Sequence, residues 1–282
     1  MKFHNPAAEV FVPDGASADA ALARTTRLGI AAHQDDLEIM AYHGILECFG
    51  QPDKHFTGVT VTSGAGSPRD GLYARYTDAE MQKVRRAEQK KAAILGEYAA
   101  QVFLDYPSAP VKDPANADVV ADLKQLLMAA KPRVVYTHNL ADKHDTHVAT
   151  ALRVIRALRE LPQAARPERL YGCEVWRGLD WMNDEDKVVF NVEAHENLAA
   201  ALLDVFDSQI CGGKRYDLAT MGRRRANATY FASHGVDEST SLNFGMDLTP
   251  LIEDDKLDIG QYVKTFIDRF AAEVSSRVAK LG

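Results

Sequence analysis

The stretch RLGIAAHQDDLEIM at residues 27–40 decides the fold of this chain. Residues 28–32 form a short apolar run, and such a run next to polar residues predicts a buried strand over 27–32. The polar loop HQDD follows at 33–36, and apolar residues near helical spacing then predict a helix over 37–49. A strand, a polar loop and a helix in immediate succession indicate an α/β sheet.

The rest of the chain repeats this alternation. We expect further strands at 56–62, 101–104, 133–137, 170–176 and 187–192, and helices at 77–95, 118–130, 148–161, 196–210, 215–231 and from about 259. Thr77 and Glu80 have the spacing of a capping box at the start of one of these helices. The alternation predicts a Rossmann-like, mostly parallel sheet flanked by helices, with a C-terminal α/β extension. We interpret residues 1–282 as a single domain, with a core at about 26–195 and a C-terminal helical extension at about 196–282.

Composition and charge exclude several classes of protein. The hydrophobic fraction of 46% and the charged fraction of 26% are ordinary for a globular protein, and the net charge of -7 argues against a nucleic-acid partner. Three widely spaced cysteines give neither a disulfide framework nor a CxxC metal pair. No run approaches the roughly 18 apolar residues of a membrane span, and the first residues lack the pattern of a signal peptide. We therefore expect a cytoplasmic protein.

Two clusters of polar residues follow the first and the fourth predicted strands. His33, Asp35 and Asp36 lie in the first cluster, and His144 and His147 lie in the second. Ligands of open α/β sheets bind at the carboxyl ends of the strands, so we expect the two clusters to meet there. Three imidazole or carboxylate ligands with one open position make a catalytic zinc site. Each residue alone reads equally well as a helix cap or a surface group, but the two clusters together predict a metal centre.

These clusters resemble the motifs of the PIG-L/LmbE family of zinc-dependent N-deacetylases. The family motif AHPDD reads AHQDD at 32–36, and its motif D-x-H-P-D-H reads DKHDTH at 142–147. An Arg-Arg-x-Glu helix that ends in Leu-Gly corresponds to residues 85–96. The resemblance covers about residues 26–175. It implies a LmbE-like fold and a zinc-dependent removal of the N-acetyl group from a sugar of the N-acetylglucosamine type.

The resemblance also implies a role for each matching residue. It implies that His33, Asp36 and His147 bind Zn²⁺, or another divalent metal ion. It implies that Asp35 is the general base that takes a proton from the attacking water. His144 would stabilise the oxyanion or protonate the leaving amine.

Two arginines are candidates for binding the substrate. The resemblance implies that Arg85 or Arg86 does so, and we favour Arg85. Arg69 lies in the glycine-rich loop at 63–70, where it could hold an anionic group, although an ordinary mobile loop is equally compatible with this sequence. A metal ion lowers the pKa of bound water from about 15.7 to about 7, and a nearby carboxylate base contributes about 10²–10⁴-fold, so the assigned roles suit amide hydrolysis.

The second motif departs from the family pattern. Thr146 stands where the family has the Asp that orients the first His, and Asp145 replaces the Pro. The partner of His144 is therefore open between Asp145, Asp142 and a backbone carbonyl. In the first motif Gln34 replaces Pro, which changes the stiffness of the loop.

Other residues carry weaker signals. The run of arginines at 223–225, with Lys214 and Arg215 nearby, could bind a phosphate or carboxylate, although a solvated helix face is the favoured interpretation. Further candidates for the pocket, each with an equally good structural interpretation, are His138, Trp176, Trp181 and His234.

The partner that these observations predict is a small amide substrate, an N-acetylated sugar, and a homo-oligomer is possible. An amidase acting on a thiol–sugar conjugate and a non-catalytic α/β protein that binds a small ligand remain alternatives. A nicotinamide-binding dehydrogenase is disfavoured, because the loop at 33–36 lacks the glycines that let a pyrophosphate approach the backbone.

Overall fold

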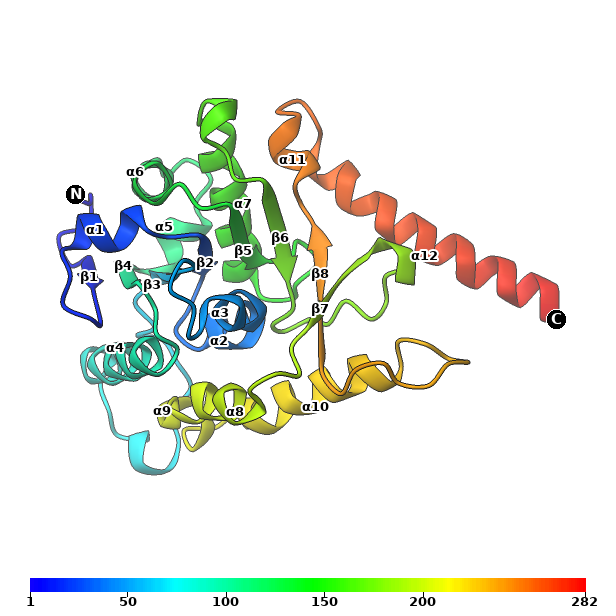
Figure 1. The fold of residues 1–282 in the computed structure, drawn as a ribbon, viewed down its shortest axis with the longest axis horizontal. Coiled ribbons are helices and arrows are strands. Elements are labelled where there is room, and N and C mark those ends of the chain that lie inside the picture. Colours follow the sequence, from blue (N-terminus) through cyan, green and yellow to red (C-terminus); the bar gives the residue numbers. More distant parts are fainter.

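An eight-stranded mixed sheet forms the centre of the computed structural model, which describes residues 1–282, and helices cover both of its faces (Figure 1). The strands are β1 (Glu9–Phe11), β2 (Arg27–Ala31), β3 (Phe56–Thr62), β4 (Ala100–Tyr106), β5 (Val134–His138), β6 (Arg169–Cys173), β7 (Lys187–Asn191) and β8 (Leu242–Asp247). The helices are α1 (Ala18–Ala23), α2 (Asp36–Met40), α3 (Tyr42–Cys48), α4 (Asp78–Leu95), α5 (Ser108–Lys112), α6 (Asp118–Ala130), α7 (Asp145–Arg159), α8 (Glu196–Asp204), α9 (Asp207–Ile210), α10 (Tyr216–Thr229), α11 (Pro250–Glu253) and α12 (Ile259–Leu281). Short 3₁₀ helices lie at Gly71–Tyr73, Gln163–Ala165 and Asp184–Asp186.

The order of the strands places a switch in the direction of winding at the centre of the sheet. That order is β1-β4-β3-β2-β5-β6-β8-β7, in which β4, β3, β2, β5 and β6 run parallel. Strands β1 and β8 are antiparallel to their inner neighbours β4 and β6, and β7 is antiparallel to β8. The chain winds outward from β2 to β4 and then continues on the other side of β2 as β5. The carboxyl ends of β2 and β5 therefore flank a topological switch point, where α/β sheets of this kind bind their ligands.

The predicted fold class, a mostly parallel α/β sheet flanked by helices, is confirmed. Helix α6 and strand β3 have the predicted bounds. The capping box of α4 is also present, because the Thr77 hydroxyl accepts a bond from the backbone N–H of Glu80 and the Glu80 carboxylate accepts one from that of Thr77.

Several elements differ from their prediction, and β1, α1, α5 and α11 were not predicted. The helix predicted at 37–49 breaks at Ala41, whose φ of -106° and ψ of 15° leave the helical region, and it forms α2 and α3. The helix predicted at 196–210 is likewise divided into α8 and α9. The helix predicted from 148 begins at Asp145, so His147 lies in the first turn of α7. Strand β8 was not predicted, and it inserts antiparallel between β6 and β7.

Two glycines let α2 lie close to the sheet. Gly29 of β2 and Gly58 of β3 are direct partners in the register of the two strands. A Cβ on either glycine would lie 2.7 Å from a methyl group of Leu37, which is closer than packed atoms can approach. The glycines thus form a hollow that the Leu37 side chain fills. Because Asp36 precedes Leu37 in the first turn of α2, this packing holds Asp36 at the carboxyl end of β2.

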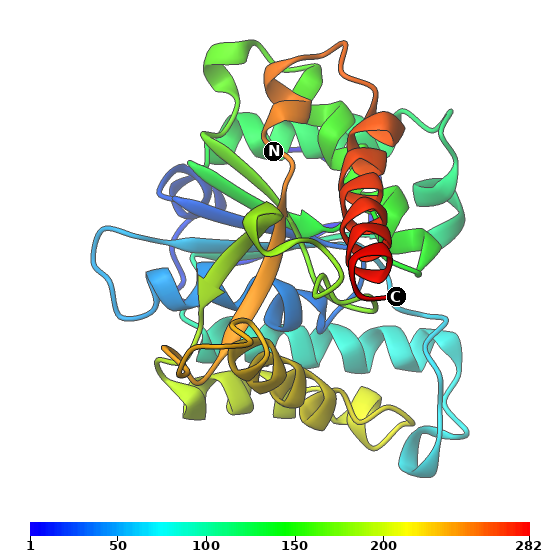
Figure 2. The same ribbon diagram turned by 90° about the vertical axis from the view of Figure 1, so that its right-hand side faces the viewer.

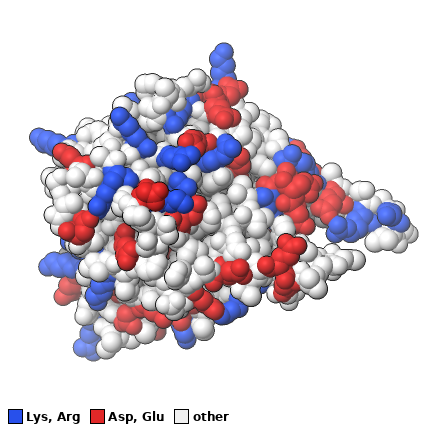
Figure 3. Space-filling model, in the orientation of Figure 1, with Lys and Arg blue, Asp and Glu red and all other residues white.

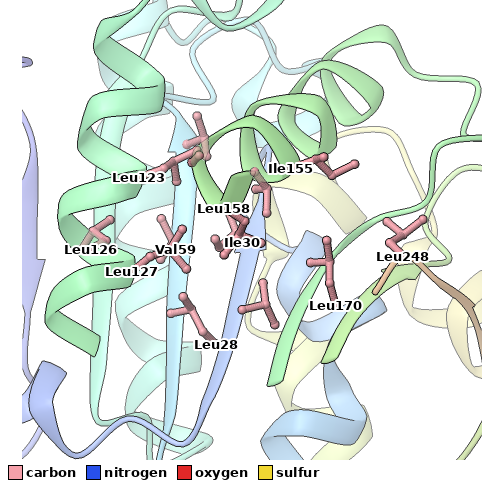
Figure 4. Close-up of a cluster of buried hydrophobic side chains, with 14 of the residues drawn as sticks. Leu28, Ile30, Val59, Leu123, Leu126, Leu127, Ile155, Leu158, Leu170 and Leu248 are labelled. Atoms are coloured by element: carbon pink, nitrogen blue, oxygen red, sulfur yellow. The ribbon is translucent and has the colours of Figure 1, made fainter. Parts of the chain in front are cut away.

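Two apolar cores, one on each face of the sheet, hold the helices in place. Successive side chains of a strand point to opposite faces. Leu28 and Ile30 of β2 therefore join the core that contains Leu123 of α6 and Leu158 of α7 (Figure 4). Ala31 belongs to the other core, beside α2 and α3. Full burial of one such leucine contributes roughly 1.5–3 kcal/mol relative to exposure, so these cores fix the strands that carry the site.

The last helix extends away from the sheet. Figure 1 shows α12 leaving the body of the molecule, with the C-terminus at its far end, and in Figure 2 this helix points toward the viewer. Phe266 is its one buried residue. None of the helices combines the length and the apolar character that crossing a bilayer requires.

A buried arginine joins α10 to the end of α2. Arg224 is 1% exposed and donates to the carbonyl oxygens of Glu38 at 2.8 Å and Ile39 at 3.3 Å. It also donates to Asn243 Oδ1 at 3.1 Å, and its guanidinium lies 4.6 Å from the centre of the Tyr42 ring. A cation at the C-terminus of a helix also suits the helix dipole. The C-terminal part of the chain thus supports the short helix that begins with Asp36.

We predict that Arg224→Met lowers the free energy of unfolding by about 2–4 kcal/mol, because it removes the side-chain donor of the buried Glu38 carbonyl oxygen and leaves Asn243 as the side-chain donor to Ile39. Urea denaturation followed by circular dichroism measures this change. The matched control is Arg225→Met, since Arg225 is exposed and pairs with Glu196 at the surface. Equal stability of the two variants would contradict the structural role given to Arg224.

Candidate functional site

Three candidate ligand atoms converge at the switch point. His33 Nδ1 lies 3.1 Å from His147 Nε2 and 3.3 Å from Asp36 Oδ2, and the latter two atoms are 3.4 Å apart. Zinc binds such atoms at about 2.0–2.1 Å in tetrahedral geometry, which sets ligand atoms about 3.3 Å from one another. The structure therefore brings together the three residues predicted as metal ligands, at the mutual distances that such an ion needs.

The loop after β2 and the first turns of α2 and α7 carry these atoms. Asp36 begins α2, and its Oδ2 accepts a hydrogen bond from the backbone N–H of His33 at 2.7 Å. Burial lowers the pKa of His33 to about 4, so its ring is neutral and keeps a free lone pair. Burial disfavours the charged form of Asp36, but the surrounding imidazoles, His147 first, outweigh it and hold the pKa of Asp36 below its ordinary value. This is the protonation state that a metal ion requires of its ligands.

A second possible ligand set includes His138 at the end of β5. His138 Nε2 lies 3.5 Å from Asp36 Oδ2, and the set is completed by His147. However, the backbone N–H of Ala32 donates to His138 Nε2 at 2.8 Å, which occupies the lone pair that would bind a metal. The His138 ring also stacks on His147, with 3.9 Å between ring centres. We infer that His138 orients the end of β2 and the ring of His147, as residues that contact the ligands of a metal site commonly do.

Asp142 supports the same ligand from the other side. Its Oδ2 lies 3.6 Å from His147 Nδ1, beyond hydrogen-bond length but close enough to favour the proton on that nitrogen. The Asp142 carboxylate is held in place by the backbone N–H groups of His144 at 2.9 Å and Trp176 at 3.0 Å. With the proton on Nδ1, His147 Nε2 is left free toward Asp36.

The His144 ring lies beside the three ligand atoms. Its ring centre is 4.5 Å from that of His147 and 5.1 Å from that of His33. Its Nδ1 is buried and has no hydrogen-bond partner, so neither Asp142, Asp145 nor a backbone carbonyl bonds the ring. Burial, together with His147, lowers the pKa of His144 below its ordinary value, which leaves a neutral ring.

Asp35 lines the same cavity in an unusual backbone conformation. Its φ of 79° and ψ of -29° lie near the left-handed region, which few residues other than Gly, Asn and Asp enter. The Asp35 carboxylate is 3.4 Å from a guanidinium nitrogen of Arg85. Burial raises the pKa of Asp35 well above its ordinary value, and although Arg85 opposes this rise, the neighbouring Asp36 carboxylate adds to it.

The arginine that we favoured as a substrate ligand, Arg85, lies in the cavity wall. It is 4% exposed, donates to the carbonyl oxygen of Gln34 at 2.6 Å and bonds the Ser67 hydroxyl. These bonds join the loop after β2 to the loop after β3. The neighbouring Arg86 points elsewhere, where it pairs with Glu9.

The structure places Arg69 outside this cavity. Its guanidinium donates to the carbonyl oxygens of Ala65 at 2.6 Å and Tyr76 at 2.8 Å, and it pairs with Asp78. These bonds close the loop after β3 on itself. Both terminal nitrogens of Arg69 are thus used within this loop, and Arg69 does not line the cavity.

A cavity of about 610 Å³ surrounds the ligand atoms. Its walls include three residues that the sequence did not single out, namely Lys112, Gln209 and Tyr216, and also Lys214 and Trp176, which were weaker candidates. They come from segments far apart in the sequence and carry no motif, so only the folded chain brings them together.

The weaker candidates of the C-terminal part have structural roles. Arg224 is buried against α2, Arg223 donates to the carbonyl oxygen of Val175 at 2.5 Å, and Arg225 pairs with Glu196. His234 lies in an exposed loop, where its ring bonds Ser233. None of these four candidates lines the cavity.

A family comparison agrees with the position of the site. Residues 28–158 match the family described as GlcNAc-PI de-N-acetylase (PIG-L). This span begins in β2 and ends in α7, so it includes all three ligand atoms. No curated protein matches the chain.

Several solved structures have a similar fold. GalB, the 4-carboxy-2-hydroxymuconate hydratase from Pseudomonas putida KT2440, is 15% identical with a TM-score of 0.62, over 79% of this chain and 95% of its own. N,N'-diacetylchitobiose deacetylase from Pyrococcus horikoshii is 17% identical with a TM-score of 0.58, over 78% and 83%. The A40926 pseudoaglycone deacetylase is 15% identical with a TM-score of 0.57, over 79% and 97%. At these identities the likeness establishes the fold.

We predict that the purified chain binds one zinc ion, and that His33→Ala and His147→Ala each abolish this binding because two ligands hold the ion poorly. Zinc per chain is measured by atomic emission after loading and desalting. His234→Ala is the control and retains the metal. Full zinc content in either ligand variant would refute the ligand set.

Proposed function

Starting from a PIG-L family domain at residues 28–158, we propose that this chain is a metal-dependent hydrolase that removes an N-acetyl group from a sugar-like substrate. The observation that best supports the proposal is the triangle formed by His33, Asp36 and His147, whose ligand atoms lie 3.1–3.4 Å apart. Asp35 and His144 line the same cavity, so candidates for moving protons lie next to the candidate metal ligands.

Two imidazoles and one carboxylate are ligands that suit Zn²⁺, which would be held by these three residues. A bound divalent ion would polarise the amide carbonyl and lower the pKa of water. The chain itself must then supply a base for the attacking water, a donor for the oxyanion and a proton for the leaving nitrogen.

Asp35 is suited to carry the proton. Its carboxylate would accept a proton from the attacking water and then pass it to the nitrogen that leaves. Arg85, 3.4 Å away, orients this carboxylate and favours its charged form, while burial and Asp36 favour the protonated form. Such opposing influences suit a group that must both accept and release a proton.

His144 is suited to stabilise the oxyanion. Its ring is neutral and therefore carries one N–H, and the absence of a partner on Nδ1 leaves ring atoms free to respond to a ligand. A donor already in place beside the reacting carbonyl stabilises the charge that develops on its oxygen. Donation of this N–H does not require the acid partner that Thr146 replaces.

The proposed substrate class rests on an aromatic residue of the cavity and on a deacetylase of similar fold. Trp176 stands beside His144, and the face of an indole ring can pack on the apolar face of a sugar. N,N'-diacetylchitobiose deacetylase, which shares this fold, is named for an N-acetylated sugar. An amide of a thiol–sugar conjugate would meet the same groups, and it belongs in the same substrate screen.

A second candidate is a hydratase acting on a polycarboxylate. Two observations favour it. The hydratase GalB has a similar fold. His144 also lacks the acid partner that the histidine of a hydrolytic dyad has. An assay for acetate release from N-acetyl sugars, run beside an absorbance assay for hydration of an unsaturated carboxylate, separates the two candidates.

We predict that Asp35→Asn lowers kcat for acetate release by about 10²–10⁴-fold, because the amide cannot accept the proton of the attacking water. Asn tolerates the left-handed backbone, so the fold and the zinc content should be unchanged. The control is Asp53→Asn, an exposed residue remote in sequence from the motifs, which keeps full activity. Undiminished turnover by Asp35→Asn would remove Asp35 as the base.

A further inference from the structure

Two lysines line the cavity without a carboxylate partner. Lys112 ends α5, which follows β4, and Lys214 lies between α9 and α10. Both side chains are exposed, and neither ammonium group has an ion pair or a hydrogen bond. Both positive charges are therefore available to a ligand of the cavity.

The two lysines belong to a chain in which acidic residues outnumber basic ones. The chain has 40 acidic and 33 basic residues, and Figure 3 shows acidic and basic side chains side by side over one face. The acidic residues of the cavity wall are Asp35 and Asp36, and both already contact a basic group or an imidazole. No carboxylate of the cavity is left to balance Lys112 and Lys214.

Lys214 is linked to the candidate catalytic groups through an aromatic ring. Its Nζ lies 5.2 Å from the centre of the Trp176 ring, a distance typical of a cation–π contact. The Trp176 ring is nearly parallel to His144, with 6.2 Å between ring centres and 27° between planes. The Lys214 ammonium thus lies over the Trp176 ring, in the part of the cavity wall next to His144 and the candidate ligand atoms.

In the strand order, the two lysines are linked to strands on opposite sides of β2 and β5. Lys112 follows β4, whereas Trp176, the residue under Lys214, follows β6. Strands β2 and β5, which precede the segments that carry the candidate ligand atoms, lie between β4 and β6 in the sheet. A molecule bound over the ligand atoms would therefore have a free cation on either side.

We propose that the substrate carries an anionic group, a phosphate or a carboxylate, which Lys214 binds from its position on Trp176 and toward which Lys112 adds a second positive charge. This inference rests on the proposed function, since it assigns a substrate class to the same cavity. The ring of the substrate lies against Trp176, and the anion projects past its edge to Lys214. A neutral sugar would leave both ammonium groups without a counter-charge.

The test compares three probes with the zinc-loaded full chain: N-acetylglucosamine, N-acetylglucosamine 6-phosphate and N-acetylmuramic acid, which are neutral, phosphorylated and carboxylated. Acetate release gives kcat and KM. Calorimetry on the Asp35→Asn variant gives the affinity of each probe independently of turnover. The variants are Lys214→Gln and Lys112→Gln, and Lys280→Gln near the end of α12 is the control.

We expect one of the two anionic probes to be preferred, and the preferred one identifies the group as phosphate or carboxylate. Lys214→Gln should raise KM and Kd for that probe by about 10- to 100-fold, because a charged hydrogen bond is lost, with kcat and zinc content unchanged. Lys112→Gln should have a smaller effect of the same sign, and added salt should weaken binding to wild type more than to Lys214→Gln.

Equal affinity for charged and neutral probes, or an affinity for the anionic probe that Lys214→Gln leaves unchanged, overturns the proposal. Neither result would affect the metal-dependent hydrolysis itself. If instead no N-acetyl sugar is hydrolysed, the proposed function fails, and the calorimetric comparison still decides whether Lys214 binds an anion.

Discussion

The structure depends on holding two imidazole nitrogens and one carboxylate oxygen within 3.4 Å of one another. The lone pairs of these atoms repel each other at such distances unless a proton or a cation lies among them. The surrounding fold opposes this repulsion. Asp36 is held by the packing of α2, and the His147 ring is held between His138 and Asp142. A site that is organised before its ion arrives loses less entropy when the ion binds.

The sequence predicts those parts of the fold that depend on local chemistry. Strand β3 and helix α6 follow from runs and periods of apolar residues, and the start of α4 follows from the capping box of Thr77 and Glu80. The candidate ligands could also be predicted from the sequence, because His33 and Asp36 lie close together in the chain and because parallel strands end at one edge of the sheet. These features need only a few neighbouring residues or a general rule of topology.

The remaining features depend on contacts between distant segments. Arg224 looks like part of a solvated basic run in the sequence, yet the carbonyl oxygens at the end of α2 bury it. Strand β8 was missed because its place between β6 and β7 is set by pairing with distant strands. Lys214 and Tyr216 reach the cavity through the packing of α9 and α10, for which no periodic signal exists. Arg69 is a reasonable anion ligand from its place in the loop, but both of its terminal nitrogens bond within that loop.

The facing glycines under α2 have a consequence for how the two central strands align. If β2 and β3 slipped by one residue, a larger neighbour such as Leu28 or Val59 would take the place of a glycine, and the space for Leu37 would close. A slip would also turn side chains to the wrong face of the sheet. The packing of Leu37 against the sheet therefore selects one register of β2 and β3, the register in which Gly29 and Gly58 are partners.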